Sequence, residues 1–157
     1  MLSHLKAHLS GKVIILGIGN TLRSDDGAGS ILASRIKDKV SFKVFDTGPT
    51  PENYLEKIIK ENPDNLVILD AADFGGSPGE VRVLEAEELR TVNFLSTHNA
   101  SITLTINYFK SSIKADIIIL IIQSKTIAFS DNLSEEVAKS LDFLEDWFSR
   151  LTKSVKD

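Results

Sequence analysis

Two kinds of hydrophobic pattern alternate along the chain. Short continuous runs of branched aliphatic residues are typical of buried strands, and they predict strands over residues 13–18, 42–46, 66–69, 81–83 and 117–122. Apolar residues spaced three or four apart are typical of amphipathic helices, and they predict helices over residues 28–36, 51–61, 102–109 and 133–155. The segment 102–109 also contains β-branched residues that suit a strand, but Ile102, Ile106 and Phe109 share one helical face.

The order of these elements predicts the class of fold. Three strands alternate with two helices up to residue 70, which is the arrangement of a parallel sheet covered by helices on both faces. Residues 81–83 alternate between apolar and polar and are expected to form a short antiparallel edge strand. We therefore expect one doubly wound, three-layer α/β/α domain over residues 1–157, with a twisted, mostly parallel five-stranded sheet and an N-terminal extension at residues 1–10.

Composition and charge narrow the possible functions. The 157 residues include 22 acidic and 18 basic side chains, and the resulting net charge of -4 disfavours a nucleic-acid partner. Because the chain has no cysteine, any metal must be held by oxygen or imidazole. The longest apolar run, at residues 117–122, is far shorter than the ~20 residues of a membrane span, and the N-terminus lacks signal-peptide features. We expect a cytoplasmic monomer without a membrane partner, with His4 and His8 of the extension at the surface.

Three aspartates lie where predicted strands end. Asp26 follows the first strand, Asp46 ends the second and Asp70 ends the third. Because parallel strands bring their carboxyl ends to one edge of the sheet, these side chains are expected to converge in a crevice near the switch in strand order. His98, just beyond the predicted edge strand, is expected to reach the same crevice. Two carboxylates and one imidazole suit a divalent transition metal such as nickel, zinc or iron.

Each of these residues also has an ordinary structural explanation. Asp25 and Asp26 precede a predicted helix, where acidic side chains cap unpaired amides. Asp46 and Asp70 at strand ends are also turn formers. His98, between two polar neighbours, fits a hydrogen-bonded loop residue. Spacing alone leaves both explanations open.

The glycine turn at residues 17–22 has an alternative interpretation as a dinucleotide-binding motif, with Asp46 at the position of a ribose-binding acid. However, Leu22 replaces the third glycine, and Asp25 and Asp26 stand where a pyrophosphate would need favourable charge. A serine hydrolase is also disfavoured, because the sequence contains no Gly-x-Ser-x-Gly motif.

Five motifs, in this order along the chain, resemble those of the hydrogenase maturation endopeptidases. They are GIGNTLRSDDGAG at residues 17–29, DTGPTPEN at 46–53, LDAAD at 69–73, PGE at 78–80 and THN at 97–99. The segments 51–53 and 97–99 are similar to the branch that processes hydrogenases of the formate hydrogenlyase type. Two positions depart from the family pattern: Asp26, where many members have glutamate, and Ser124, where many have proline.

This resemblance implies a cytoplasmic protease that removes a short C-terminal extension from the precursor of a nickel-iron hydrogenase large subunit after nickel insertion. It implies an α/β sandwich of the phosphorylase/hydrolase-like kind around a twisted five-stranded sheet. It also implies that nickel belongs to the substrate, that no organic cofactor is needed, and that Asp26, Asp70 and His98 are both the metal-contacting and the catalytic residues. The residues expected to orient these ligands or contact the substrate are Asn20, Asp46, Asp73 and Asn99.

Two other functions remain open at this point. The same three ligands would serve a maturation factor that senses nickel in the precursor without cleaving it. A peptidyl-tRNA hydrolase shares a Gly-x-Gly-Asn turn after its first strand, but the acidic net charge disfavours a tRNA substrate.

Overall fold

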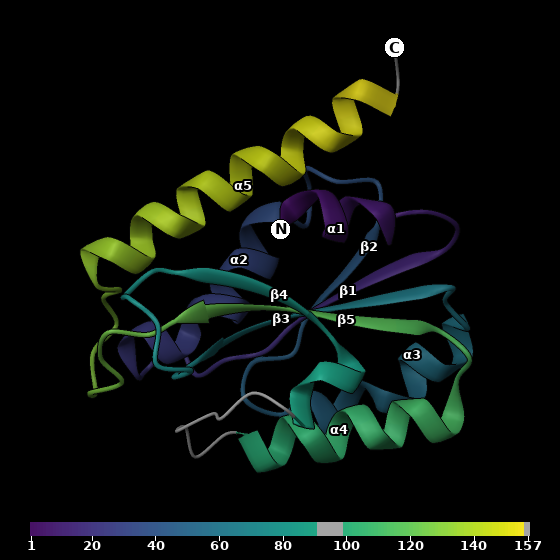
Figure 1. Cartoon of the computed structure of the whole chain (residues 1–157), viewed down its shortest axis with the longest axis horizontal. Helices are drawn as coiled ribbons and strands as arrows, with labels where there is room; N and C mark the ends of the chain where they lie inside the picture. Colours follow the sequence, from purple (N-terminus) through teal and green to yellow (C-terminus); the bar gives the residue numbers. More distant parts are fainter. Residues whose placement is uncertain (91–98, 156–157) are drawn as a thin grey trace.

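A five-stranded sheet forms the centre of the computed structural model, which describes residues 1–90 and 99–155. The strand order is β2-β1-β3-β5-β4, and only β4 runs antiparallel to its neighbour, β5 (Figure 1). The strands are β1 Val13–Gly17, β2 Lys43–Asp46, β3 Asn65–Ala72, β4 Val81–Glu85 and β5 Asp116–Gln123. The predicted strands and the antiparallel edge are therefore confirmed.

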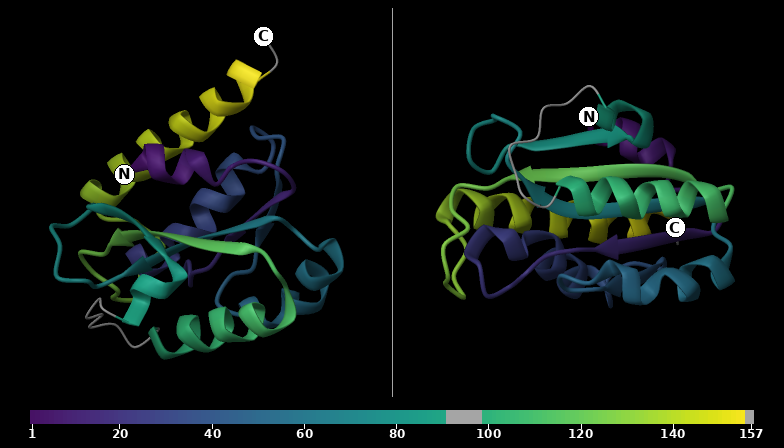
Figure 2. Two further views of the ribbon diagram at one scale, coloured as in Figure 1. Left: turned by 45° about the vertical axis from the view of Figure 1, so that its right-hand side comes forward. Right: turned by 90° about the horizontal axis from the view of Figure 1, so that it is seen from below.

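Helices cover both faces of this sheet, as Figures 1 and 2 show. One face carries α1 Leu2–Ala7, α2 Ala28–Ile36 and α5 Glu135–Val155, and the other carries α3 Leu55–Glu61 and α4 Asn99–Ser112. Three 3-10 turns complete the described elements: η1 Ser24–Gly27, η2 Pro51–Tyr54 and η3 Ala86–Arg90. The helix predicted over residues 102–109 is confirmed as part of α4, whereas α1 was not predicted by the hydrophobic pattern.

The core divides into two layers because successive strand residues point to opposite faces. In β1, Val13 and Ile15 pack against the α2 and α5 face, and Ile14 and Leu16 pack against the α3 and α4 face. The same alternation holds in β3 and β5, so every central strand is buried on both sides. Each fully buried aliphatic side chain contributes about 1.5 to 3 kcal/mol to folding. Because these strands are buried on both faces, they consist of continuous apolar runs in the sequence.

The helix α5 is amphipathic along its length. Its inner face is formed by Val137, Leu141, Leu144 and Phe148, all fully buried. No helix within the described ranges is long and apolar enough to cross a membrane.

The glycines of the first motif allow η1 and α2 to lie directly on the strand ends. A Cβ atom on Gly29 would lie 2.3 Å from the carbonyl oxygen of Leu69 in β3 and 2.4 Å from that of Ile18. A Cβ atom on Gly19 would lie 2.4 Å from the carbonyl oxygen of Asp26. No side chain fits at these contacts, so the glycine turn serves close packing and places η1 against the end of β3.

The strand order creates a crevice between β1 and β3. The chain leaves β1 toward β2 on one side and later returns to β3 on the other, which makes this the switch point where ligands bind in open α/β sheets. Gly17, the last residue of β1, pairs with Leu69, and β3 continues three residues further to Ala72. Asp70 is thus the first residue of β3 beyond the pairing with β1.

Candidate functional site

A cavity of about 110 Å³ lies at the carboxyl ends of β1 and β3. It is lined by segments that are far apart in the sequence: the turn after β1, η1, the loop before η2, the end of β3 and the first turn of α4. Its polar lining includes Asn20, Asp26, Glu52 and Asp70, and its apolar lining includes Pro51 and Ile102. The cavity therefore lies where the strand ends predicted a crevice.

Asp70 is the most unusual residue of this cavity. Its side chain is buried, with 3% of the residue exposed. Oδ1 accepts a hydrogen bond from the Ala71 N–H at 2.8 Å, but the buried Oδ2 has no hydrogen-bond partner among the described residues. Leaving a buried polar oxygen without a hydrogen-bond partner is costly, and such an oxygen on a cavity is typical of a site that binds another ligand.

The electrostatics of Asp70 support this interpretation. Burial raises the pKa of the Asp70 carboxyl well above its usual range; the hydrogen bond from Ala71 opposes this shift, and the negative charge of Asp26 adds to it. Asp26 lies in η1 and is also buried, with 4% exposed. Two buried carboxylates on one small cavity repel each other, and a cation between them would relieve both the repulsion and the burial penalty.

The third predicted ligand, His98, lies outside the described residues. The next residue, Asn99, begins α4, and Ile102 of the same helix lines the cavity. Within the ranges 1–90 and 99–155, no three histidine, aspartate or glutamate side chains are grouped so as to hold a metal. Asp26 and Asp70, the two predicted ligands that the structure describes, thus supply oxygen donors and need further ligands to complete a metal site.

The other predicted residues differ in their relation to the cavity. Asn20 lines it, and its Oδ1 accepts the Leu22 N–H at 3.0 Å, which fixes the turn. Asp46 is exposed and accepts hydrogen bonds from the hydroxyl of Ser30 and the N–H of Gly48. It is not among the cavity-lining residues, and its described bonds join α2 to the loop after β2.

Asp73 follows the end of β3 and also stands outside the cavity lining. Its Oδ1 accepts hydrogen bonds from the Gly75 N–H and from Nε2 of Gln123, each at 3.1 Å. Oε1 of Gln123 in turn accepts the N–H groups of Phe74 and Gly76. Asp73 therefore shapes the loop between β3 and β4.

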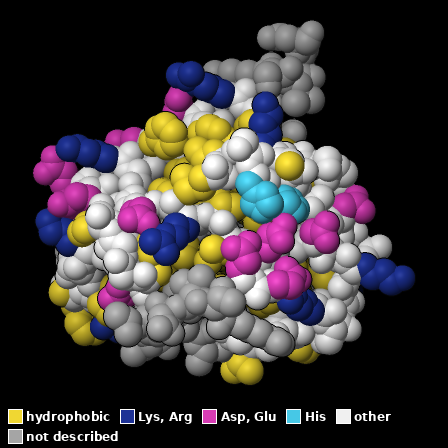
Figure 3. All heavy atoms as spheres, viewed as in Figure 1, with side chains coloured by type: hydrophobic (Ala, Val, Ile, Leu, Met, Phe, Trp, Pro, Cys, Tyr) yellow, Lys and Arg dark blue, Asp and Glu magenta, His cyan; other side chains and the backbone are white. Residues whose placement is uncertain are grey.

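The histidines of the N-terminal helix lie away from this cavity. His4 is exposed, as predicted, whereas His8 is half-buried, and Figure 3 shows histidine side chains beside a group of acidic ones. The Nε2 atoms of His4 and His8 are 3.4 and 3.7 Å from Oε1 of Glu85 at the end of β4.

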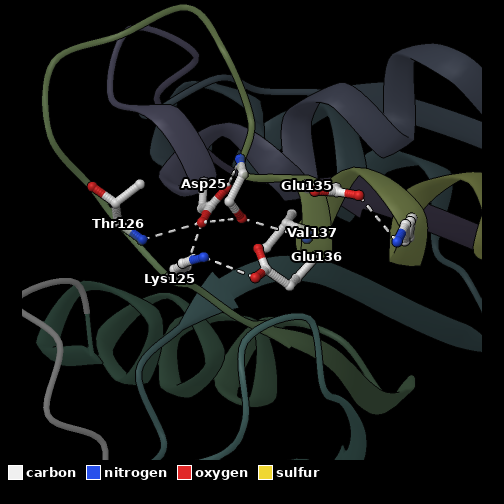
Figure 4. Close-up of polar contacts among 8 residues, drawn as sticks. Asp25, Lys125, Thr126, Glu135, Glu136 and Val137 are labelled. Carbon is white, nitrogen blue, oxygen red and sulfur yellow. Dashed lines mark hydrogen bonds and ion pairs between the residues drawn. The ribbon is translucent and has the colours of Figure 1, made fainter.

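Two residues near the site had no functional role in the sequence-based prediction. Glu52 in η2 lines the cavity, although only the motif containing it had been recognised. Asp25 is fully buried and makes no capping hydrogen bond to η1 or α2. Its carboxylate instead binds the loop after β5, as Figure 4 shows. No local signal distinguishes Asp25 from Asp26, because the partners of Asp25 lie about a hundred residues later in the chain.

The fold and this cavity define a doubly wound α/β protein with a candidate cation site formed by two buried carboxylates at its switch point. The comparisons give the family: the chain belongs to the hydrogenase maturation proteases, whose family model matches residues 28–149. The resemblance seen in the motifs is thereby confirmed, and the protein is an enzyme, a protease.

Individual relatives agree with this assignment. The hydrogenase 3 maturation protease of Escherichia coli K12 is 31% identical over 140 residues, covering 85% of this chain and 89% of its own length. The crystal structure of the NiFe hydrogenase maturation protease HycI from Thermococcus kodakarensis KOD1 superposes with a TM-score of 0.83 at 29% identity, covering 96% of this chain and 99% of that one. The solution structure of the endopeptidase HycI from Escherichia coli gives a TM-score of 0.78 at 28% identity, covering 88% and 89%.

Proposed function

We propose that this protein is an endopeptidase that removes a short C-terminal extension from the nickel-loaded precursor of a nickel-iron hydrogenase large subunit. The observation that carries the proposal is the buried carboxylate pair, in which Oδ2 of Asp70 has no partner among the described residues and shares a cavity with Asp26. The names of the relatives, hydrogenase maturation proteases and endopeptidases, support the reaction and the class of substrate.

In this proposal nickel arrives as part of the precursor. Asp26, Asp70 and His98 complete the coordination of that ion, since carboxylate and imidazole donors both suit nickel. The bound ion would supply Lewis acidity, either by polarising the scissile carbonyl or by activating a water molecule. The chain itself supplies the placement, because Asp26 in η1 and Asp70 in β3 are both buried at the cavity before the substrate binds.

The carboxylate pair also explains why nickel would act as a recognition signal. Two aspartates and one histidine leave coordination positions for groups of the precursor, so the free enzyme would hold nickel weakly. A precursor without nickel would leave the two carboxylates repelling each other, and its peptide would gain nothing from entering the cavity. Recognition and positioning of the scissile bond then depend on the same ion.

The residue roles are tested by processing assays with variants of two of the three ligands. Asp26→Asn and His98→Ala are expected to slow cleavage of a nickel-loaded precursor by about 100-fold or more, with unchanged circular dichroism. Asp142→Asn is the matched control, because Asp142 lies on α5 with its side chain 74% exposed, and it should process at the wild-type rate. Normal processing by His98→Ala would remove the metal-ligand role.

A further inference from the structure

Exposed apolar side chains gather on two loops at the carboxyl edge of the sheet. Leu22, in the turn after β1, is 66% exposed, and Ile127 and Phe129, in the loop after β5, are 37% and 83% exposed. We call these three residues the loop patch. Single exposed hydrophobic residues are common, but neighbouring ones on two joined loops mark an interaction surface.

Hydrogen bonds join the two loops side by side. The Ser130 N–H donates to the Leu22 carbonyl at 3.0 Å, and the Ser24 N–H donates to the Ser130 carbonyl at 2.8 Å. Nε of Arg23 donates to the Ile127 carbonyl at 3.1 Å, and its guanidinium carbon lies 5.3 Å from the centre of the Phe129 ring. The backbone beneath the patch is thus held before any partner arrives, which lowers the entropy lost on binding.

Asp25 anchors this pair of loops from beneath. Its fully buried carboxylate accepts hydrogen bonds from the N–H groups of Lys125, Thr126 and Ser134 and from the Ser134 hydroxyl, at 2.8 to 3.1 Å. Figure 4 shows Asp25 facing Lys125 and Thr126 of the loop after β5. A fully buried carboxylate therefore fixes the conformation of two exposed loops. Such a fixed shape suits a surface that binds a partner.

The loop patch is continuous with the candidate site. Residues 20–26 form one segment: Asn20 and Asp26 line the cavity, and Leu22 between them belongs to the patch. The cavity itself, at about 110 Å³, is small beside the 300 to 1,000 Å³ of typical ligand pockets. It offers little room for peptide side chains, so selection of one protein substrate requires contacts outside it.

We propose that the loop patch is the docking surface for the folded hydrogenase precursor, whose C-terminal tail then enters the cavity. The complementary surface of the precursor would be apolar, with an acidic group placed opposite Arg23. This inference rests on the proposed function, because it takes the precursor as the occupant. Docking of the folded precursor at the patch needs no nickel, whereas entry of the tail into the cavity and cleavage of the scissile bond require the ion.

The test uses the double variant Leu22→Ser/Phe129→Ser and the full-length precursor. The double variant should raise KM for the nickel-loaded precursor and Kd for the nickel-free precursor by about tenfold, and kcat should stay unchanged. Phe143→Ser is the matched control, because Phe143 is 60% exposed and lies on α5 rather than on either loop of the patch, and it should leave both constants unchanged. If the double variant folds poorly, Phe129→Ser alone replaces it, since that ring is the most exposed of the three.

The outcomes separate docking from catalysis. KM and Kd both within about twofold of the wild type would overturn the docking proposal while leaving the protease intact. Weaker binding of the nickel-free precursor by the variant, with no cleavage by any form of the enzyme, would support docking and refute the endopeptidase. A patch-dependent dimer in sedimentation experiments, with no precursor binding by the wild type, would assign the patch to a second copy of this chain and overturn the proposal.

Discussion

Replacing Asp25 by alanine is expected to destabilise the fold strongly. The carboxylate is fully buried and accepts four hydrogen bonds from the loop after β5. Hydrogen bonds to charged groups contribute about 1.5 to 3 kcal/mol each, but Lys125 and Thr126 are exposed residues whose N–H groups water can reach in part. We therefore expect a loss of about 3 to 5 kcal/mol in the free energy of unfolding, below the simple sum of four bonds.

Asp25→Asn keeps the shape of the side chain but removes its charge and one acceptor oxygen, so comparison with Asp25→Ala separates these two effects. Oδ2 accepts three of the four bonds and Oδ1 accepts one, from the Ser134 N–H. An amide oriented with its oxygen at the Oδ2 position keeps three bonds and turns its NH₂ group toward the Ser134 N–H. The expected cost is about 1 to 2 kcal/mol, smaller than that of alanine.

Urea unfolding followed by the fluorescence of Trp147 measures both values. Trp147 is the only tryptophan and packs on Phe148 at a ring distance of 5.1 Å within α5. With a slope of about 2 kcal/mol per molar urea, the alanine variant should shift the midpoint down by about 1.5 to 2.5 M. A shift in the free energy of unfolding below about 0.5 kcal/mol for alanine would refute the anchoring role of Asp25.

Two further predictions concern the cavity and its support. Asp70→Asn should abolish processing and yet stabilise the fold by about 0.5 to 2 kcal/mol at neutral pH. Because the pKa of Asp70 is raised in the folded state, its contribution to stability is present below the ordinary value of 3.8 and is lost as the pH rises through the folded-state pKa. Thermal unfolding at several pH values should show the gain shrinking toward pH 3.8; a gain independent of pH would contradict this reasoning. Gly29→Ala should cost about 1 to 3 kcal/mol in urea unfolding, because its Cβ would lie 2.3 Å from the Leu69 carbonyl oxygen; an unchanged midpoint would show that α2 can move away from β3.

The sheet could be predicted from the sequence because its central strands are buried on both faces and therefore consist of continuous apolar runs. A run such as Ile117 to Ile122 is buried on both faces, so its residue types alone identify it. The helix at residues 102–109 was harder, because β-branched residues also suit a strand. The shared helical face of Ile102, Ile106 and Phe109 correctly predicted a helix, and Phe109 on that face is fully buried.

The limits of the sequence-based prediction appear where distant residues meet. The short helix α1 was not predicted, because it spans six residues and only one of them, Leu5, is buried, while Leu2 packs only partly against the same core. Asp25 and Asp26 are adjacent and chemically identical, yet one binds the loop after β5 and the other lines the cavity. Which does which depends on the conformation of η1 and on a loop about a hundred residues away.

The central claim is tested most directly by intact mass spectrometry of a cognate hydrogenase large-subunit precursor incubated with this protein, with and without prior nickel loading. We expect a loss of mass equal to a C-terminal peptide from the nickel-loaded precursor and no loss from the nickel-free one. An unchanged mass of the loaded precursor would contradict the endopeptidase activity. Equal cleavage of both forms would contradict recognition through nickel.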